Sequence, residues 1–261
     1  MLTKAKLTTV WVLATMLAGG LPDHEAFAAE HVDLALVLTA DVSGSVDEHR
    51  FRLQRDGYAA ALTSNDVLSA IAGGPSRAIA VAFVEFASSN NQKVVIDWTV
   101  LRDAESAAIV AELIRSEPRS FQGGTAIGEA IRFSMARFAT GDVDAERRVI
   151  DVSGDGTNND GRPVTQARDE AIAAGITVNG IAILSPENLD SHTNPPGGLL
   201  AYYRENVVGG PGAFALAAEN FSAFAQAIRN KLIREIAGDS DLDRHGYAQA
   251  IPAADDLDIL P

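Results

Sequence analysis

Residues 32–45 have the sequence VDLALVLTADVSGS, and this stretch decides the fold. Its first eight residues are almost all apolar and rich in Val and Leu, which is typical of a strand buried on both faces of a parallel sheet. Its last five residues, Asp41 to Ser45, form a polar segment that contains one glycine. A buried strand that runs into such a segment predicts a ligand-binding loop at the carboxyl end of a central strand.

Strand and helix patterns alternate along the rest of the chain. Further strands are predicted at 78–86, 93–98, 147–152, 176–184 and 213–216. Helices are predicted at 46–62, 103–114, 126–138, 164–174, 199–206 and 220–236. Because few residues separate the second and third strands, we expect a hairpin there and an antiparallel third strand at an edge. The prediction is an α/β fold: a doubly wound, mostly parallel six-stranded sheet with one antiparallel edge strand and helices on both faces.

The start of the chain has the pattern of a cleaved signal peptide over residues 1–28. Lys4 and Lys6 precede a mostly apolar run over 7–18, and residues 26–28 (AFA) have the small-x-small pattern that signal peptidase accepts. The alternative is an uncleaved membrane anchor, but the run is shorter than the ~20 apolar residues that cross a bilayer. We therefore expect an exported protein.

The expected mature chain has one domain over 29–237 and an acidic, weakly patterned tail over 238–261 that we expect to be disordered. No later stretch is long and apolar enough to predict a membrane span in the mature chain. The sequence contains no cysteine, which excludes disulfides, thiolate nucleophiles and cysteine metal sites. We expect a monomer that is located in a bacterial periplasm or secreted.

The charge balance limits the kinds of partner. The formal net charge is −14, so nucleic acid and anionic membranes would be repelled. Metal cations and basic protein patches are better matched to this surface. An acidic balance is also a common means of staying soluble, and that alternative explanation remains open.

The polar segment after the first strand has the spacing of a cation-binding loop. Asp41, Ser43 and Ser45 stand at positions i, i+2 and i+4, so their oxygens can converge on one point. Gly44 allows the backbone to turn tightly between them. Carboxylate and hydroxyl donors, without imidazole or thiolate, favour a hard cation such as Mg²⁺, with Mn²⁺ or Ca²⁺ also possible.

Two further polar segments are predicted at the same edge of the sheet. Thr125 follows two glycines and enters the helix over 126–138, where it can cap the helix and offer its hydroxyl. Asp155 lies just after the strand over 147–152 and supplies a second carboxylate. Taken singly, each segment is better explained by helix capping or a turn. Their joint occurrence at strand ends favours one shared metal site.

With these residues in place, the chain resembles a von Willebrand factor A-type domain over about 32–237. The segment Asp41-Val42-Ser43-Gly44-Ser45, together with Thr125 and Asp155, matches the family's metal-ion-dependent adhesion site. More closely, the sequence resembles an exported bacterial branch of unknown function.

The resemblance implies roles for the five residues. Ser43, Ser45 and Thr125 would bind the ion through their hydroxyls, while Asp41 and Asp155 often act through water. A Glu or Asp carboxylate of a protein partner would fill the remaining position on the metal. The function implied is a metal-dependent adhesion or assembly module, and we expect no enzymatic activity.

The main alternative is a metal-dependent phosphotransferase of the haloacid dehalogenase-like type, with Asp41 as nucleophile and Asp155 in its acidic loop. Those enzymes need a second aspartate two residues after the nucleophile as general acid, and here Ser43 stands there. A hydroxyl does not donate a proton at neutral pH as a tuned carboxyl does. A serine hydrolase is also disfavoured, because Ser43 and Ser45 lie outside any Gly-x-Ser-x-Gly elbow.

Several other features have simpler explanations. The segment 155–160 begins like an EF-hand loop but has Asp160 at the glycine position, so we interpret it as a polar loop. Trp98, Tyr202 and Tyr203 are interpreted as packing residues outside the site. The apolar face of the helix over 220–236 is interpreted as core, the alternative being a helix that moves when the metal site is occupied.

Overall fold

The computed structural model describes residues 30–140, 143–184 and 194–238. The predicted signal peptide, the chain beyond Gly238 and most of the Pro-rich and Asn-rich loop after the fifth strand lie outside these residues. In the described part of the chain, no helix has the length and apolar character needed to cross a membrane.

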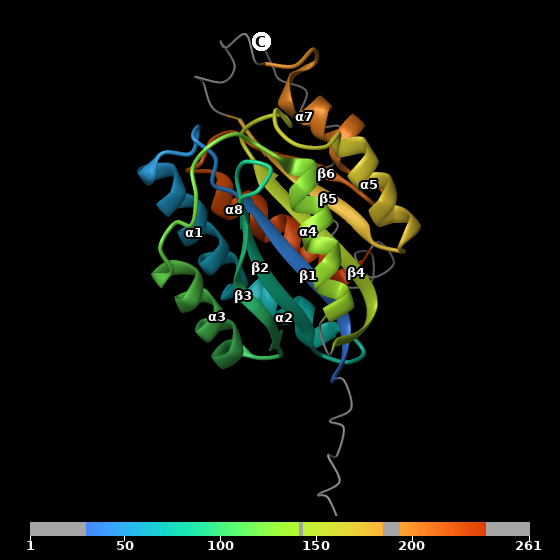
Figure 1. Ribbon diagram of the computed structural model, residues 1–261. Helices are drawn as coiled ribbons and strands as arrows, with labels where there is room; N and C mark the ends of the chain where they lie inside the picture. Colours follow the sequence, from blue (N-terminus) through green and yellow to red (C-terminus); the bar gives the residue numbers. More distant parts are fainter. Residues whose placement is uncertain (1–29, 141–142, 185–193, 239–261) are drawn as a thin grey trace, which may run out of the picture.

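One six-stranded sheet forms the centre of the molecule, in the order β3-β2-β1-β4-β5-β6 (Figure 1). Its strands are β1 (Glu30–Asp41), β2 (Ile79–Phe86), β3 (Gln92–Leu101), β4 (Val143–Gly154), β5 (Thr177–Ile183) and β6 (Ala215–Ala218). β3 runs antiparallel to β2, and every other neighbouring pair is parallel. The fold class predicted from the sequence is confirmed, including its antiparallel edge strand.

Helices cover both faces of the sheet. They are α1 (Glu48–Leu62), α2 (Asn65–Gly73), α3 (Ala104–Ser116), α4 (Ile127–Thr140), α5 (Val164–Ala173), α7 (Gly198–Tyr202), the single π-helical turn η1 (Tyr203–Val207) and α8 (Phe224–Ala237). α1 packs against α3 and α8, and α2 also packs against α8, which builds one layer. α4, α5 and η1 build the layer on the opposite face, seen at the front of the sheet in Figure 1.

β1 is buried on both faces, as its apolar run predicts. Leu34, Leu36 and Leu38 belong to the core beneath α1 and α8. Val37, whose side chain points to the other face, packs against Phe138 of α4. Because β1 lies in the middle of the sheet, its carboxyl end opens at the centre of one edge of the molecule.

Two packing interpretations are also confirmed. Trp98 packs against Phe138 with ring centroids 5.4 Å apart, and its indole Nε1 donates to the Arg137 carbonyl. Phe224 and Leu232 of α8 are fully buried in the main core.

The structure differs from the prediction in element lengths and in one helix. No element was predicted over 65–73, where α2 forms, capped by the Ser64 side chain, which accepts from Val67 N. α2 follows α1 after two residues, so no loop pattern separates the two helices. β4 begins at Val143 because it pairs there with Glu30 of β1, although residues 143–146 are too polar to predict a strand. α8 begins at Phe224, four residues later than expected.

A buried ion cluster fastens α8 to the sheet. Lys231 Nζ lies 2.7 Å from Asp151 Oδ1 and also pairs with Glu235, and all three side chains are fully buried. Asn179 Nδ2 donates to Glu235 Oε1 at 2.8 Å. Burial raises the pKa of Glu235 to about 7, against the lowering effect of the Lys231 charge. Two carboxyl groups therefore share one ammonium group in the core.

Candidate metal centre

The candidate site lies where the strand order reverses. β1 has β2 on one side and β4 on the other, so the chain leaves the carboxyl ends of β1 and β4 in opposite directions. This edge is the upper end of the sheet in Figure 1. Asp41 is the last residue of β1, and Asp155 directly follows β4. The two carboxylates therefore flank the switch point, the usual ligand position in such sheets.

The loop after β1 is fixed by its own polar groups. Asp41 is fully buried, and its Oδ1 accepts a hydrogen bond from Ser43 N at 2.7 Å. This short side-chain turn is the reason an aspartate suits the position. At the end of the loop, the Asp47 side chain caps α1 by accepting from Arg50 N at 2.8 Å. Ser45 is exposed, so solvent reaches the site through this loop.

Hydroxyl and carboxyl groups of two separate loops meet beside Asp41. The Ser43 and Ser45 hydroxyl oxygens lie 3.2 Å apart. Ser45 Oγ donates to Asp155 Oδ1 at 2.6 Å, which joins the loop after β1 to the loop after β4. The structure thus brings together four of the five residues singled out in the sequence.

Thr125 lies at the same place, on the loop that enters α4. Gly44 N donates to the Gly123 carbonyl at 2.8 Å, which ties this loop to the loop after β1. Thr125 N donates to Asn159 Oδ1 at 2.8 Å, and a Cβ atom added at Gly156 would lie 3.7 Å from the Thr125 hydroxyl. The Thr125 side chain is therefore adjacent to the Asp155 loop, and all five predicted residues gather at one edge.

The charges of the site favour a bound cation. Burial and the neighbouring Asp155 charge together raise the pKa of Asp41 to about 7, against hydrogen bonds from Ser43 and the charge of Arg119. Asp41 Oδ2 is buried and has no hydrogen-bond partner among the described residues. A divalent cation would offset the repulsion between the two carboxylates and satisfy the remaining oxygen.

The donor set also indicates which kind of cation fits. Within the described ranges, no group of three or more His, Cys, Asp and Glu side chains is placed to hold a metal ion. The site instead combines two carboxylates with three hydroxyls, all of them hard oxygen donors. The residues present therefore fit Mg²⁺ or a similar cation whose charge they neutralise only in part.

Arg119 positions the loop after β1, a role that the sequence did not reveal. Its Nη2 donates to the carbonyl oxygens of Val42 and Ser43, each at 2.6 Å, and its Nη1 donates to the Val46 carbonyl at 2.5 Å. Its Nε donates to Phe121 O at 2.8 Å. A single arginine in a loop carries no pattern, so no sequence signal could have identified it.

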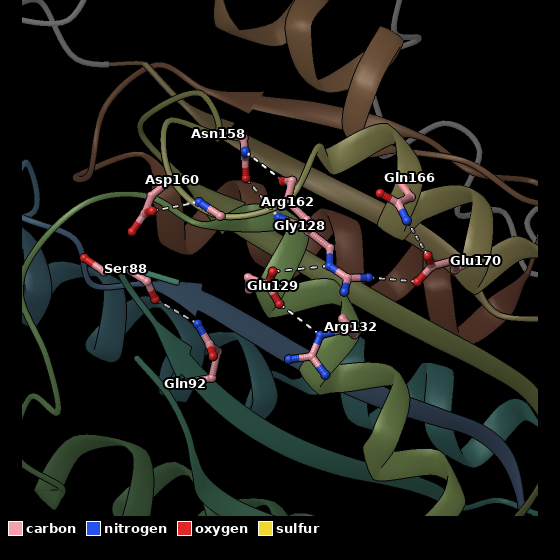
Figure 2. A network of polar contacts seen from close by, with 11 residues as sticks. Ser88, Gln92, Gly128, Glu129, Arg132, Asn158, Asp160, Arg162, Gln166 and Glu170 are labelled. Atoms are coloured by element: carbon pink, nitrogen blue, oxygen red, sulfur yellow. Dashed lines mark hydrogen bonds and ion pairs between the residues drawn. The ribbon is translucent and has the colours of Figure 1, made fainter. Parts of the chain in front are cut away.

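A polar network fixes the loop that follows Asp155 (Figure 2). Asn158 Oδ1 accepts from Gly128 N at 2.9 Å, which attaches this loop to the first turn of α4. Asp160 Oδ2 accepts from Ser89 N at 2.8 Å, which attaches it to the turn after β2. In Figure 2 the Arg162 side chain lies between Glu129 and Glu170, and it pairs with both. The segment 155–160 is thus a braced polar loop, as interpreted from the sequence.

The interpretation of the two tyrosines needs a correction. Tyr203 is fully buried, as a packing residue should be, but its hydroxyl lies at the candidate site and not away from it. The neighbouring Tyr202 hydroxyl accepts a hydrogen bond from Asn158 N at 3.1 Å. Both side chains come from the segment α7–η1, whose approach to the site depends on tertiary packing.

Comparisons with known proteins identify a family and a fold. Residues 31–240 match the family described as "Protein of unknown function (DUF1194)". No curated protein sequence matches the chain. Among solved structures, a von Willebrand factor type A protein from Catenulispora acidiphila is similar with a TM-score of 0.54 and 16% identity, over 79% of this chain and 43% of that one.

A pilus adhesin and a byssus matrix protein share the same fold. The pilus adhesin SpaC from Lactobacillus rhamnosus GG is similar with a TM-score of 0.58 and 16% identity, over 78% of this chain and 31% of that one. Proximal thread matrix protein 1 from the mussel byssus has a TM-score of 0.53 and 16% identity, over 80% and 47% of the two chains. A second structure of the byssus protein, with a TM-score of 0.52, is described as having a "zinc occupied MIDAS motif". The chain spans less than half the length of each of these proteins.

Proposed function

Because this chain belongs to the family described as protein of unknown function DUF1194 and has the von Willebrand factor A fold, we propose that it is a metal-dependent protein-binding module. The proposed metal is Mg²⁺, with Mn²⁺ or Ca²⁺ as alternatives. One observation carries the proposal: three loops from distant parts of the chain bring two carboxylates and three hydroxyls to the switch point, with a buried Asp41 oxygen left unsatisfied.

The five candidate residues would contribute to ion binding in two different ways. Ser43, Ser45 and Thr125 would bind it through their hydroxyls, and Asp41 and Asp155 would supply the negative charge. When bound, the metal provides an electrophilic centre that accepts a carboxylate oxygen. Because Ser45 is exposed, a Glu or Asp of a protein partner has a route to that centre.

The setting of the module follows from the sequence. We propose that the domain over 29–237 is exported after removal of residues 1–28 and acts in a bacterial periplasm or outside the cell, as a monomer. The signal-peptide pattern over residues 1–28 and the presence of a pilus adhesin among the structural neighbours support this proposal. The tail over 238–261 is proposed to be disordered.

The proposal assigns no catalytic role to the site. Phosphoryl transfer from Asp41 would need a second carboxyl group at the position of Ser43. Ser43 Oγ instead lies 3.2 Å from the Ser45 hydroxyl oxygen. The backbone amide of Ser43 donates a hydrogen bond to the Asp41 carboxylate. The neighbouring groups thus help to hold an ion and provide no general acid.

The site assignment is tested by isothermal titration of the EDTA-treated protein with Mg²⁺ and Mn²⁺. Asp41→Ala should abolish measurable binding, because it removes a buried carboxylate from the centre of the donor set. Asp56→Ala is the matched control, since Asp56 is an exposed aspartate of α1 that pairs with Arg115 and is not one of the five candidate ligands. Unchanged metal affinity in Asp41→Ala would make the site assignment wrong.

The binding role needs a second experiment. The immobilised protein is exposed to a periplasmic extract in the presence of Mg²⁺ and again with EDTA, alongside Asp41→Ala. A protein retained only by the unsubstituted module with Mg²⁺ supports the proposal. Phosphatase activity that disappears in Asp41→Asn would support the enzyme alternative and contradict it.

A further inference from the structure

Tyr203 places a phenol hydroxyl beside Asp41. A Cβ atom added at Gly154 would lie 2.7 Å from the Tyr203 hydroxyl oxygen and 2.9 Å from Asp41 Oδ2, so both oxygens border the same small space. Both are buried, and neither has a hydrogen-bond partner among the described residues. Buried hydroxyls and carboxylates normally have partners, so this pair indicates a function.

Two glycines leave space for the aromatic ring of Tyr203. Gly154 ends β4, where any side chain would collide with the phenol oxygen and with Asp41. Gly180 lies in the middle of β5, where an added Cβ would approach Tyr203 Cδ1 to 2.7 Å. Glycine weakens a strand interior, so its use at both positions is explained by the close approach of the ring.

The backbone at Tyr203 is also unusual. Tyr203 begins the π-helical turn η1, in which Val208 N donates to Tyr203 O at 3.0 Å. Such turns are rare and occur frequently at functional sites. At the preceding position, the Tyr202 hydroxyl contacts Asn158 N of the loop after Asp155. The segment α7–η1 therefore reaches two of the loops that build the candidate metal centre.

We propose that Tyr203 is a positioning residue of the metal centre, whose hydroxyl donates to Asp41, directly or through one water, and orients that carboxylate toward the cation. This inference rests on the proposed metal-binding function. It extends the site to a fourth segment of the chain, α7–η1, which the five-residue pattern does not include.

The geometry gives the hydroxyl one suitable role. Asp41 Oδ1 is already held by Ser43 N, so Oδ2 is the oxygen that Tyr203 borders. A phenol hydroxyl has an ordinary pKa of about 10 and carries one O–H donor. The phenol therefore stays protonated and acts as a hydrogen-bond donor. Groups that hydrogen-bond a metal-binding carboxylate fix its orientation, and their loss typically weakens metal affinity about 10-fold to 100-fold.

Tyr203→Phe tests the proposal because it removes the hydroxyl and keeps the ring. Tyr58→Phe is the matched control, since it removes a buried tyrosine hydroxyl whose partner is Ser153 Oγ and not Asp41. Mg²⁺ and Mn²⁺ affinities are measured by isothermal titration, and thermal unfolding in EDTA reports on folding without metal. We expect Tyr203→Phe to weaken metal binding by about 10-fold or more and to alter the electron paramagnetic resonance spectrum of bound Mn²⁺. Tyr58→Phe should leave that spectrum unchanged.

A measurement on the unsubstituted protein makes the test independent of whether the variant folds. Mg²⁺ should produce a tyrosine ultraviolet difference spectrum in the unsubstituted protein and in Tyr58→Phe. Wild-type affinity in a folded Tyr203→Phe, equal losses in both variants, or no spectral change would each overturn the inference. If the unsubstituted protein itself bound no metal, the proposed function would fail first, so the two failures are distinguishable.

Discussion

At the proposed cation site, Asp41 is the residue whose charged form is electrostatically unfavourable. The residue is fully buried, it faces a second buried carboxylate, and only one of its oxygens is hydrogen-bonded within the described residues. In the absence of a cation, the ionised form is disfavoured both by burial and by Asp155. A bound cation would offset both of these unfavourable effects.

This unfavourable ionisation predicts how the stability of the apoprotein changes with pH. The pKa of Asp41 is raised from 3.8 to about 7 in the folded state. The folded protein therefore binds this proton more tightly than the unfolded chain does. The resulting stabilisation is present below the unfolded pKa and is lost as the pH rises through about 7. Asp41→Asn should remove this dependence and stabilise the apoprotein near pH 8 by roughly 2–4 kcal/mol.

The measurement is urea unfolding in EDTA, at a series of pH values from about 5 to about 8. The quantity of interest is the difference between the unsubstituted protein and Asp41→Asn, because other groups titrate in both. Added Mg²⁺ should reverse the order of stability, since only the aspartate holds the metal. A difference that stays constant across the pH series would contradict the prediction.

At the scale of elements, the site is held by loops that brace one another. Arg119 binds three carbonyl groups of the loop after β1, and Gly44 N binds the loop that enters α4. The loop after β4 is attached in turn to the first turn of α4 and to the turn after β2. Each loop that carries a candidate ligand is therefore fixed by contacts outside itself, which reduces the ordering required when an ion binds.

Arg119→Met should loosen the loop after β1. The change removes hydrogen bonds from a charged donor to partly buried carbonyl groups, each worth about 1.5–3 kcal/mol. We expect a loss of at least about 2 kcal/mol in unfolding free energy together with weaker Mg²⁺ binding. Chemical denaturation and titration calorimetry measure the two effects.

Arg52→Met provides the matched control for Arg119. The Arg52 side chain is 68% exposed and makes only an i,i+4 pair with Glu48, so its loss should change stability by less than about 0.5 kcal/mol. Equal and small effects in both variants would mean that Arg119 does not position the loop.

For the whole molecule, two separate groups of buried charges are neutralised in different ways. At the carboxyl ends of β1 and β4, two carboxylates face each other beside a solvent-exposed loop. Beneath α8, Asp151 and Glu235 are both paired with Lys231, and the cluster carries one surplus negative charge when all three groups are ionised. A cation from solution would neutralise the first arrangement. In the second, Lys231 supplies the positive charge.

Lys231→Met should therefore be among the most damaging substitutions away from the metal centre. It leaves two buried carboxylates without their ammonium partner, and breaking a buried pair in this way costs about 3–5 kcal/mol. Glu235→Gln removes the surplus charge, and since burial raises the pKa of Glu235 to about 7, we expect little loss or a gain in stability above that pH. Urea unfolding near pH 8 compares the two. A larger loss in Glu235→Gln than in Lys231→Met would refute this account of the cluster.

The sequence by itself determined the sheet and the list of candidate ligands. The apolar run of β1 and the strand and helix patterns that follow it are local signals, and chain order then limits the sheet to few arrangements. Because parallel strands end at a common edge, Asp41 and Asp155 could be assigned to one place before any contact was known. Thr125 lies between α3 and α4, and the family resemblance assigned it to the same site.

Only the tertiary structure decided what surrounds those residues. The polar start of β4 becomes a strand because β1 is beside it, and α2 forms where the sequence shows no boundary. Arg119 and Tyr203 reach the site through tertiary contacts, so no spacing rule could have identified them. The physical reason is the separation along the sequence over which each signal acts. Periodicity reflects only the few residues within one turn or strand, whereas these roles depend on packing between distant parts of the chain.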